Sequence, residues 1–202
     1  VGSEMCIRDR HYTMGGVRTK PTGESPTLKG LFAAGEAACW DMHGFNRLGG
    51  NSVAETVVAG MIVGEFIADF CDKAENGIDI PTSLIYGALA KEEARLKSFM
   101  NNGGSENAYE IRTRMQEIMT TKIGIFRKGA DMESAVAELE ELYKRSFKVS
   151  VKDVVGPNPE LIYAYRTQKM LRVALSVAYG ALNRKESRGA HYREDFPVRN
   201  DI

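Results

Sequence analysis

The chain has 202 residues, and its 43% hydrophobic content is enough for a core in one large domain or two small ones. Its 27 Lys and Arg residues balance 27 Asp and Glu residues. This balance excludes the overall basic field that draws proteins to nucleic acid or anionic lipid, so we expect no nucleic-acid partner. The cysteines at positions 6, 39 and 71 form no Cys-x-x-Cys pair. They predict neither a zinc site nor a disulfide framework, and they favour a reducing compartment.

The first ten residues, VGSEMCIRDR, show no hydrophobic periodicity and no apolar run typical of a signal peptide. They resemble a translated adapter sequence of the kind found at the ends of gene models. We interpret residues 1–10 as a non-native leader without function.

Residues 11–75 are rich in glycine and small apolar residues. The apolar run at 30–35 is bounded by glycines and predicts a buried parallel strand. Ser52 and Glu55 form a capping box, which predicts a helix from Ser52 to about Cys71. This helix is apolar nearly all round, so we expect it to be buried, with its two internal glycines facing another element.

Residues 76–202 carry charged, amphipathic segments separated by glycines. The pattern predicts four helices, at roughly Thr82–Met100, Glu106–Thr121, Met132–Phe147 and Asn158–Arg184, the last with Asn158 as N-cap and Pro159 in the first position. The longest apolar stretch of the chain, residues 57–63, is too short to span a bilayer. The predicted fold class is therefore an α/β fragment followed by an α-helical C-terminal bundle.

Two short segments of the first part could bind a ligand. In the segment 11–16, paired glycines allow a tight bend or close approach and could place His11 beside something bound, although a structural histidine is the alternative. In the segment 30–36, Glu36 follows the predicted strand at the sheet edge where ligands bind in open α/β folds. Its carboxylate could accept hydrogen bonds from ligand hydroxyls, and the alternative is a capping or surface glutamate.

The segment 43–52 is denser in residues capable of binding. Arg47 offers a planar fork that can hold a carboxylate through two hydrogen bonds. Gly49 and Gly50 allow the backbone to pass close to a flat ligand. Asn51 and Ser52 then open a helix whose free N–H groups favour negative charge, such as that of a reduced flavin. The alternative is a glycine-rich turn with an exposed arginine.

Four segments, HYTMGG (11–16), GLFAAGE (30–36), HGFNRLGGNS (43–52) and ESRGAHYRED (186–195), together resemble the flavoprotein subunits of fumarate reductases and succinate dehydrogenases. The residues at 40–45 are most similar to the quinol:fumarate reductases of the epsilon-proteobacterial type. The resemblance implies that residues 11–75 are the C-terminal part of an FAD-binding domain and residues 76–202 the helical C-terminal domain.

The resemblance also implies site residues. His11 and Arg47 match positions that bind the dicarboxylate, and positions that contact FAD are matched by Tyr12, Thr13, Glu36, Arg47, Leu48, Gly49, Gly50, Asn51, Ser52 and Val53. His191 and its flanking arginines match a motif for which we expect a structural role. No catalytic residue and no metal ligand is implied, because the family's proton donor lies elsewhere.

The implied activity is the interconversion of fumarate and succinate by hydride transfer at FAD. The proton donor and the ADP-binding half are missing, so the fragment alone is expected to be inactive. Implied partners are an iron–sulfur subunit and a membrane anchor subunit, with a location at the cytoplasmic face of the inner membrane. An L-aspartate oxidase-like flavoprotein and a non-catalytic helical interaction module remain the alternatives.

Overall fold

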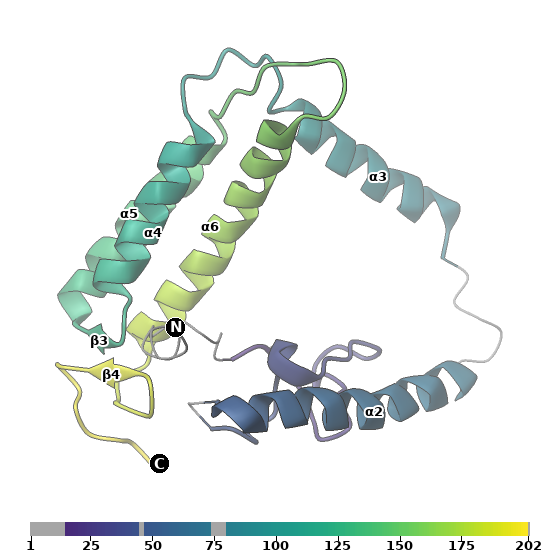
Figure 1. Ribbon diagram of the computed structural model, residues 1–202, viewed down its shortest axis with the longest axis vertical. Coiled ribbons are helices and arrows are strands. Elements are labelled where there is room, and N and C mark those ends of the chain that lie inside the picture. Colours follow the sequence, from purple (N-terminus) through teal and green to yellow (C-terminus); the bar gives the residue numbers. More distant parts are fainter. Residues whose placement is uncertain (1–14, 45–46, 74–79, 202) are drawn as a thin grey trace. The chain divides into compact units, whose positions relative to one another are not determined.

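The computed structural model describes residues 15–44, 47–73 and 80–201 (Figure 1). His11, Tyr12 and Thr13 lie outside the described residues, as does the proposed leader. The chain divides into two compact units. The first is Val1–Asp79 with Arg188–Ala190, and the second is Ile80–Ser187 with His191–Ile202.

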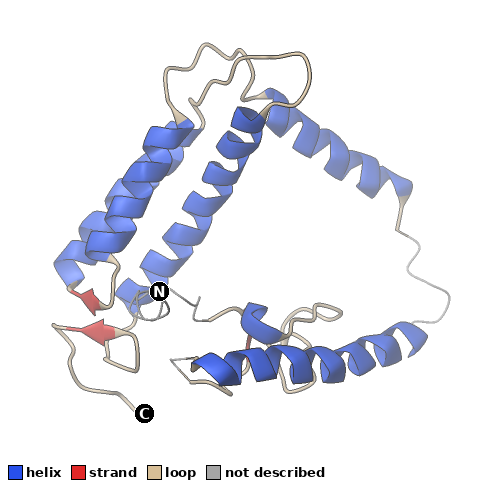
Figure 2. Ribbon diagram, in the orientation of Figure 1, coloured by secondary structure: helices blue, strands red, loops and turns tan. Residues whose placement is uncertain are grey.

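The first unit contains two short strands that pair with each other, and a 3-10 turn that packs against one long helix (Figures 1 and 2). Strand β1 (Val17–Arg18) pairs in parallel with β2 (Ala38–Cys39). The turn η1 (Gly35–Ala37) leads directly into β2 and packs against helix α2 (Gly49–Lys73). Gly35 has a φ of +64°, and a Cβ there would lie 3.1 Å from Thr56 Oγ1. Glycine is therefore what allows the turn to adopt this conformation so close to the helix.

The strand predicted at 30–35 is wrong. Phe32 forms only an isolated antiparallel bridge with Glu24, and Gly35 already belongs to the 3-10 turn. Gly30, with a φ of +79°, adopts the left-handed conformation, as Gly35 does, and both residues break the extended backbone. The Phe32 ring packs edge-on against Phe70 of α2 instead, with centroids 5.6 Å apart.

Helix α2 differs from the prediction in its start and its burial. It begins at Gly49, and the Ser52 N–H donates to the Leu48 carbonyl at 3.0 Å, so Ser52 is inside the helix rather than its cap. The capping box is therefore wrong. Only Ser52, Glu55 and Val63 are buried, whereas Met61 is 70% exposed. Gly60 and Gly64 are also exposed, against expectation. The short elements of this unit are too small to cover a 25-residue helix on all sides.

The second unit contains the four predicted helices. They are α3 (Thr82–Lys97), α4 (Ala108–Lys122), α5 (Gly129–Ser146) and α6 (Pro159–Asn183), and each end lies within three residues of its predicted position. The predicted cap of α6 is confirmed, because the Asn158 side chain accepts a hydrogen bond from the Leu161 N–H at 3.2 Å. Strand β3 (Phe126–Arg127) pairs in parallel with β4 (Tyr192–Arg193).

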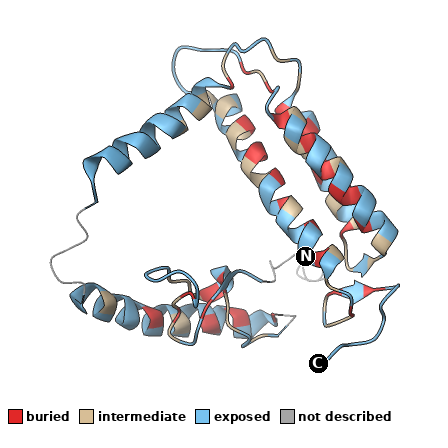
Figure 3. Ribbon diagram, turned by 180° about the vertical axis from the view of Figure 1, so that it is seen from behind, coloured by how far each residue is buried: buried red, intermediate tan, exposed pale blue. Residues whose placement is uncertain are grey.

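The core of this unit lies among α4, α5 and α6, which run side by side (Figures 1 and 3). Ile111, Ile118, Leu139 and Leu171 are at most 1% exposed. Helix α3 has no buried residue among those described and is joined to α6 by polar contacts. Arg95, for example, donates two hydrogen bonds to Gln168 on α6, at 3.0 and 2.7 Å. The predicted fold class, an α/β fragment followed by an α-helical bundle, is confirmed in outline.

Candidate functional site

Arg47 lies in the loop between β2 and α2, and its side chain is drawn inward. The residue is only 7% exposed, and its Nη2 donates to the Ala38 carbonyl at 2.7 Å and to the Gly15 carbonyl at 3.1 Å. The alternative of an exposed arginine on a glycine-rich turn is therefore wrong. These bonds place the guanidinium beside the backbone that directly follows residues 11–14, the segment containing His11.

Glu36 is held at the first turn of α2. Ser52 Oγ donates to Glu36 Oε1 at 3.0 Å, and Ser52 is fully buried while Glu36 is exposed. One carboxylate oxygen is thus anchored by the helix, and the group remains accessible to solvent. This arrangement suits a carboxylate that accepts hydrogen bonds from the hydroxyls of a ligand. It brings together two of the residues predicted to contact FAD.

The start of α2 presents open backbone. Leu48, Gly49, Gly50, Asn51 and Val53 are all exposed. A Cβ added at either glycine would meet no atom within 4 Å among the described residues. The first N–H groups of a helix have no acceptor within it and carry its positive dipole end. A flat, electron-rich ring could approach here and accept hydrogen bonds, so the residues present fit a flavin.

A second glycine sets the path of the segment that precedes β1. Gly16 has a φ of +141°, and a Cβ there would lie 2.5 Å from the Ala37 carbonyl oxygen. Only glycine can pass this close to η1. The backbone at Gly16 is therefore pressed against the turn that carries Glu36. The structure thus gathers Arg47, Glu36 and the helix start in one region.

The cavity found in this unit lies elsewhere. It has a volume of about 210 Å³ and is lined mainly by apolar side chains of α2 and of the loops facing it, Val58 and Ile62 among them. Neither Glu36 nor Arg47 lines it. We therefore assign the candidate site to the start of α2 and not to this cavity.

Sequence reasoning missed a buried polar cluster next to the site. Glu55, on α2, is 3% exposed and accepts a hydrogen bond from Trp40 Nε1 at 3.4 Å. Its other oxygen, Oε2, lies 3.7 Å from His43 Nε2. The available signal was a glutamate within an otherwise apolar helical run, which we interpreted as part of a capping box.

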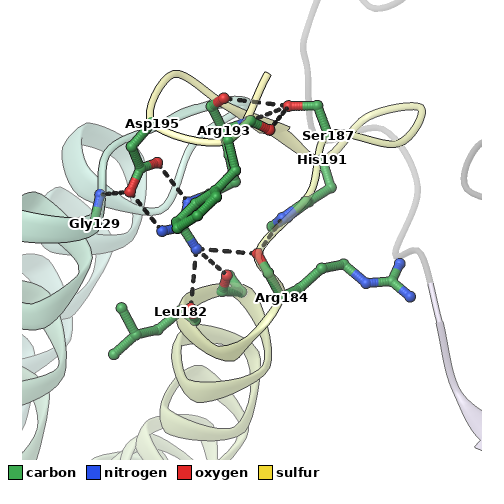
Figure 4. Close-up of polar contacts among 9 residues, drawn as sticks. Gly129, Leu182, Arg184, Ser187, His191, Arg193 and Asp195 are labelled. Carbon is green, nitrogen blue, oxygen red and sulfur yellow. Dashed lines mark hydrogen bonds and ion pairs between the residues drawn. The ribbon is translucent and has the colours of Figure 1, made fainter. Parts of the chain in front are cut away.

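The motif at 186–195 forms a second cluster, which joins two helix ends (Figure 4). Arg193 is 2% exposed, and its Nη1 donates to carbonyls of the last turn of α6, including that of Leu182 at 2.9 Å. The rest of its guanidinium holds Asp195 through bonds of 2.8 and 2.7 Å. Asp195 in turn accepts the Gly129 N–H at the start of α5 at 3.1 Å. Arg193 and Asp195 therefore link the C-terminal end of α6 to the N-terminal end of α5.

His191 contributes to the same cluster as a neutral ring. Arg127 donates to its Nδ1, and because a guanidinium can only donate, the ring proton must reside on Nε2. That nitrogen lies 3.2 Å from the Arg184 carbonyl at the end of α6 and can donate to it. Burial, and then the charge of Arg127, lowers the pKa of His191, which favours the neutral form. These contacts are those of a structural residue.

The class of protein follows from the family models that match the two ends of the chain. Residues 3–53 match the family model of an FAD-binding domain, and residues 112–202 match the model described as the fumarate reductase flavoprotein C-terminus. The chain is thus part of a flavoprotein in which a helical domain follows the FAD-binding domain. FAD, the predicted cofactor, is the ligand of the matched domain family.

Individual relatives narrow the class. The fumarate reductase flavoprotein subunit of Helicobacter pylori is 54% identical over 193 residues, which are 95% of this chain and 27% of that protein. A solved structure of Escherichia coli quinol fumarate reductase matches with a TM-score of 0.84 and 39% identity, covering 95% of this chain and 32% of that one. Mycobacterium smegmatis Sdh1 in complex with UQ1 matches with a TM-score of 0.83 and 34% identity, covering 94% and 31%.

The chain belongs to the fumarate reductase/succinate dehydrogenase flavoprotein family. It spans about a third or less of the length of the relatives it matches. Among the described residues no helix is both long and apolar enough to cross a membrane.

Proposed function

We propose that this chain is part of a flavoprotein subunit that interconverts fumarate and succinate. The observation that carries the proposal is the position of Arg47, which is buried and tied to the backbone following His11. An arginine fixed in this way can hold a carboxylate in one orientation with little loss of entropy on binding. FAD, when bound, supplies the hydride chemistry.

The residues of this chain act as binding and orienting groups. Arg47 and His11 would hold the substrate carboxylate, and the positive charge of Arg47 would polarise the dicarboxylate. Glu36, anchored by Ser52, would accept hydrogen bonds from cofactor hydroxyls. The open N–H groups at Gly49 and Gly50 would stabilise negative charge on the flavin. The further FAD contacts are Tyr12, Thr13, Leu48, Asn51 and Val53.

Partners follow from the same proposal. Solved structures similar to this chain include quinol fumarate reductases and Mycobacterium smegmatis Sdh1. We propose an iron–sulfur subunit, which takes electrons to or from the flavin, and a membrane anchor subunit, which places the complex at the cytoplasmic face of the inner membrane. The domain boundaries that we propose are 11–75 and 76–202, after a leader at 1–10. The match at residues 112–202 to the fumarate reductase C-terminus favours this function over an aspartate oxidase or a helical interaction module.

Replacing Arg47 with lysine in the complete protein tests the proposal. Lysine keeps the charge but loses the fork. Since a charge-assisted hydrogen bond contributes roughly 1.5–3 kcal/mol, one lost bond should lower kcat/KM for fumarate by at least about tenfold. Bound flavin should change much less, because Glu36 and the start of α2 remain.

Arg18→Lys is the matched control. Arg18 is an exposed arginine of the same unit, paired with Asp41 at 2.6 Å, and its replacement should leave turnover unchanged. Near-normal turnover of Arg47→Lys would remove Arg47 from the substrate site. A loss of flavin equal to the loss of turnover would show that Arg47 acts through FAD binding and not through the substrate carboxylate.

A further inference from the structure

Glu55 is a carboxylate that the binding roles described so far leave unused. Its side chain is 2% exposed, although it lies only two turns into α2. Burying a carboxylate costs several kcal/mol unless hydrogen bonds or a cation compensate for the lost water. The groups that contact it are therefore informative about why the residue is there.

Both groups near Glu55 come from the loop that leads to Arg47. Trp40 donates its indole N–H to Oε1 at 3.4 Å, and His43 Nε2 lies 3.7 Å from Oε2. Neither Oε2 nor His43 Nε2 has a hydrogen-bond partner among the residues that the structure describes. Two buried polar atoms that face each other in this way would make a hydrogen bond of ordinary length if they approached by about 1 Å.

The described part of this loop is held at four places, one of which is the ion pair between Asp41 and Arg18 at 2.6 Å. Its start continues from β2, which pairs with β1. Its far end is fixed by Arg47, whose Nη2 donates to the Ala38 carbonyl at 2.7 Å. Between these two points, Trp40 and His43 reach across to Glu55 on the helix that the loop enters. Glu55 is thus the residue of α2 that lies against Trp40 and His43 in the described part of the loop.

We infer that Glu55 is a positioning residue, which holds the loop through Trp40 and His43 and so sets the place of the Arg47 guanidinium for the substrate carboxylate. The inference rests on the proposed role of Arg47. It assigns no contact with substrate to Glu55. Because a bidentate grip depends on geometry, a displaced fork should weaken substrate binding more than it changes the later chemistry.

The test is a double-mutant cycle in the full-length flavoprotein, with kcat and KM for fumarate measured using a reduced dye as electron donor. Glu55→Ala should raise KM at least fivefold with kcat within about twofold and with bound flavin unchanged. In an Arg47→Lys background the same change should have no further effect on KM, because the fork that Glu55 positions is already lost. Glu55→Gln should restore at least half of the loss, since its amide oxygen can accept the Trp40 N–H.

Two further variants serve as a control and as a substitute for Glu55→Ala. Glu65→Ala removes an exposed acid from the same helix and should leave KM unchanged. If Glu55→Ala does not fold, Trp40→Phe, which removes only the indole N–H donor, takes its place with an expected threefold rise in KM that vanishes in the Arg47→Lys background.

The outcomes separate the two ideas. If Arg47→Lys leaves KM and kcat normal, the proposed site itself fails. If Arg47→Lys is impaired but the effects of the two substitutions multiply independently, or Glu55→Ala has a normal KM, Glu55 does not act through Arg47 and the inference is overturned.

Discussion

Arg193 is a charged side chain that the chain buries almost completely, and its contacts explain how it can be buried. Arg193 donates to the carbonyl oxygens at the end of α6 and to both oxygens of Asp195. Its hydrogen bonds lower the pKa of Asp195 to about 2, so the pair is ionised at any ordinary pH. Buried charges are stable only when paired in this way, and removing one partner is correspondingly costly.

We expect Arg193→Lys to destabilise the chain by about 3 kcal/mol or more, because an ammonium group cannot reach both the helix end and Asp195. Urea unfolding followed by circular dichroism measures this change. Arg199→Lys is the control: Arg199 is 62% exposed and pairs with Asp201, so its replacement should stay within about 0.5 kcal/mol. Equal midpoints for the two variants would contradict the role of Arg193 at the helix ends.

His191 predicts a pH dependence. Its pKa in the folded chain lies below the ordinary value of 6.5, so between the two values the unfolded chain binds the proton more readily. The stability that His191 contributes is therefore complete above about pH 6.5 and is lost as the pH falls below it. We expect a lower melting temperature at pH 5.5 than at pH 7.5, and a smaller difference in His191→Gln. An unchanged difference would show that other groups cause it. Asp195 titrates only near pH 2 and does not contribute in this window.

At the scale of elements, local sequence signals predicted helix positions correctly where the helix ends form no hydrogen bonds to residues distant in sequence. The Asn158 cap and the glycines between helices act within a few residues, and the helices of the second unit lie where these signals place them. The start of α2 was misplaced because Ser52 has a partner distant in sequence, Glu36, which takes its hydroxyl away from the helix end. A capping residue and a tertiary hydrogen bond look the same in a sequence.

The N-cap of α6 offers a test at this scale. Asn158→Ala removes the acceptor of the Leu161 N–H and should cost about 1 kcal/mol of stability. Asn158→Ser keeps an acceptor for this N–H without placing a carboxylate against the Lys152 carbonyl, to which the Asn158 amide donates at 2.9 Å, and should cost much less. The unfolding midpoints of both variants decide the matter, and a stable alanine variant would show that the cap is satisfied in another way.

At the scale of the whole molecule, apolar surface stays uncovered on α2. Val57, Val58 and Met61 are each more than half exposed. The chain also carries no net charge, so no overall charge repulsion keeps two copies apart. Contiguous exposed apolar surface of this kind favours association.

We therefore expect the 202-residue chain to associate in solution, and Val57→Lys to reduce association because it places a charge within the apolar surface. Light scattering over a range of concentrations measures the effect. Lys73→Arg, at the end of the same helix, is a control that should change nothing. A chain that is already monomeric at high concentration would contradict the expectation.

The sequence by itself determined the helices of the second unit, the cap of α6 and the family, because local hydrophobic period, cap chemistry and short motifs are properties of neighbouring residues. It also singled out Glu36, Arg47 and the glycines at the start of α2. Only the tertiary structure decided that Arg47 is buried against the Ala38 and Gly15 carbonyls, that Ser52 serves Glu36, and that Glu55 faces Trp40 and His43. These contacts join residues nine to 32 positions apart, and no local pattern records which distant group a buried polar side chain will find.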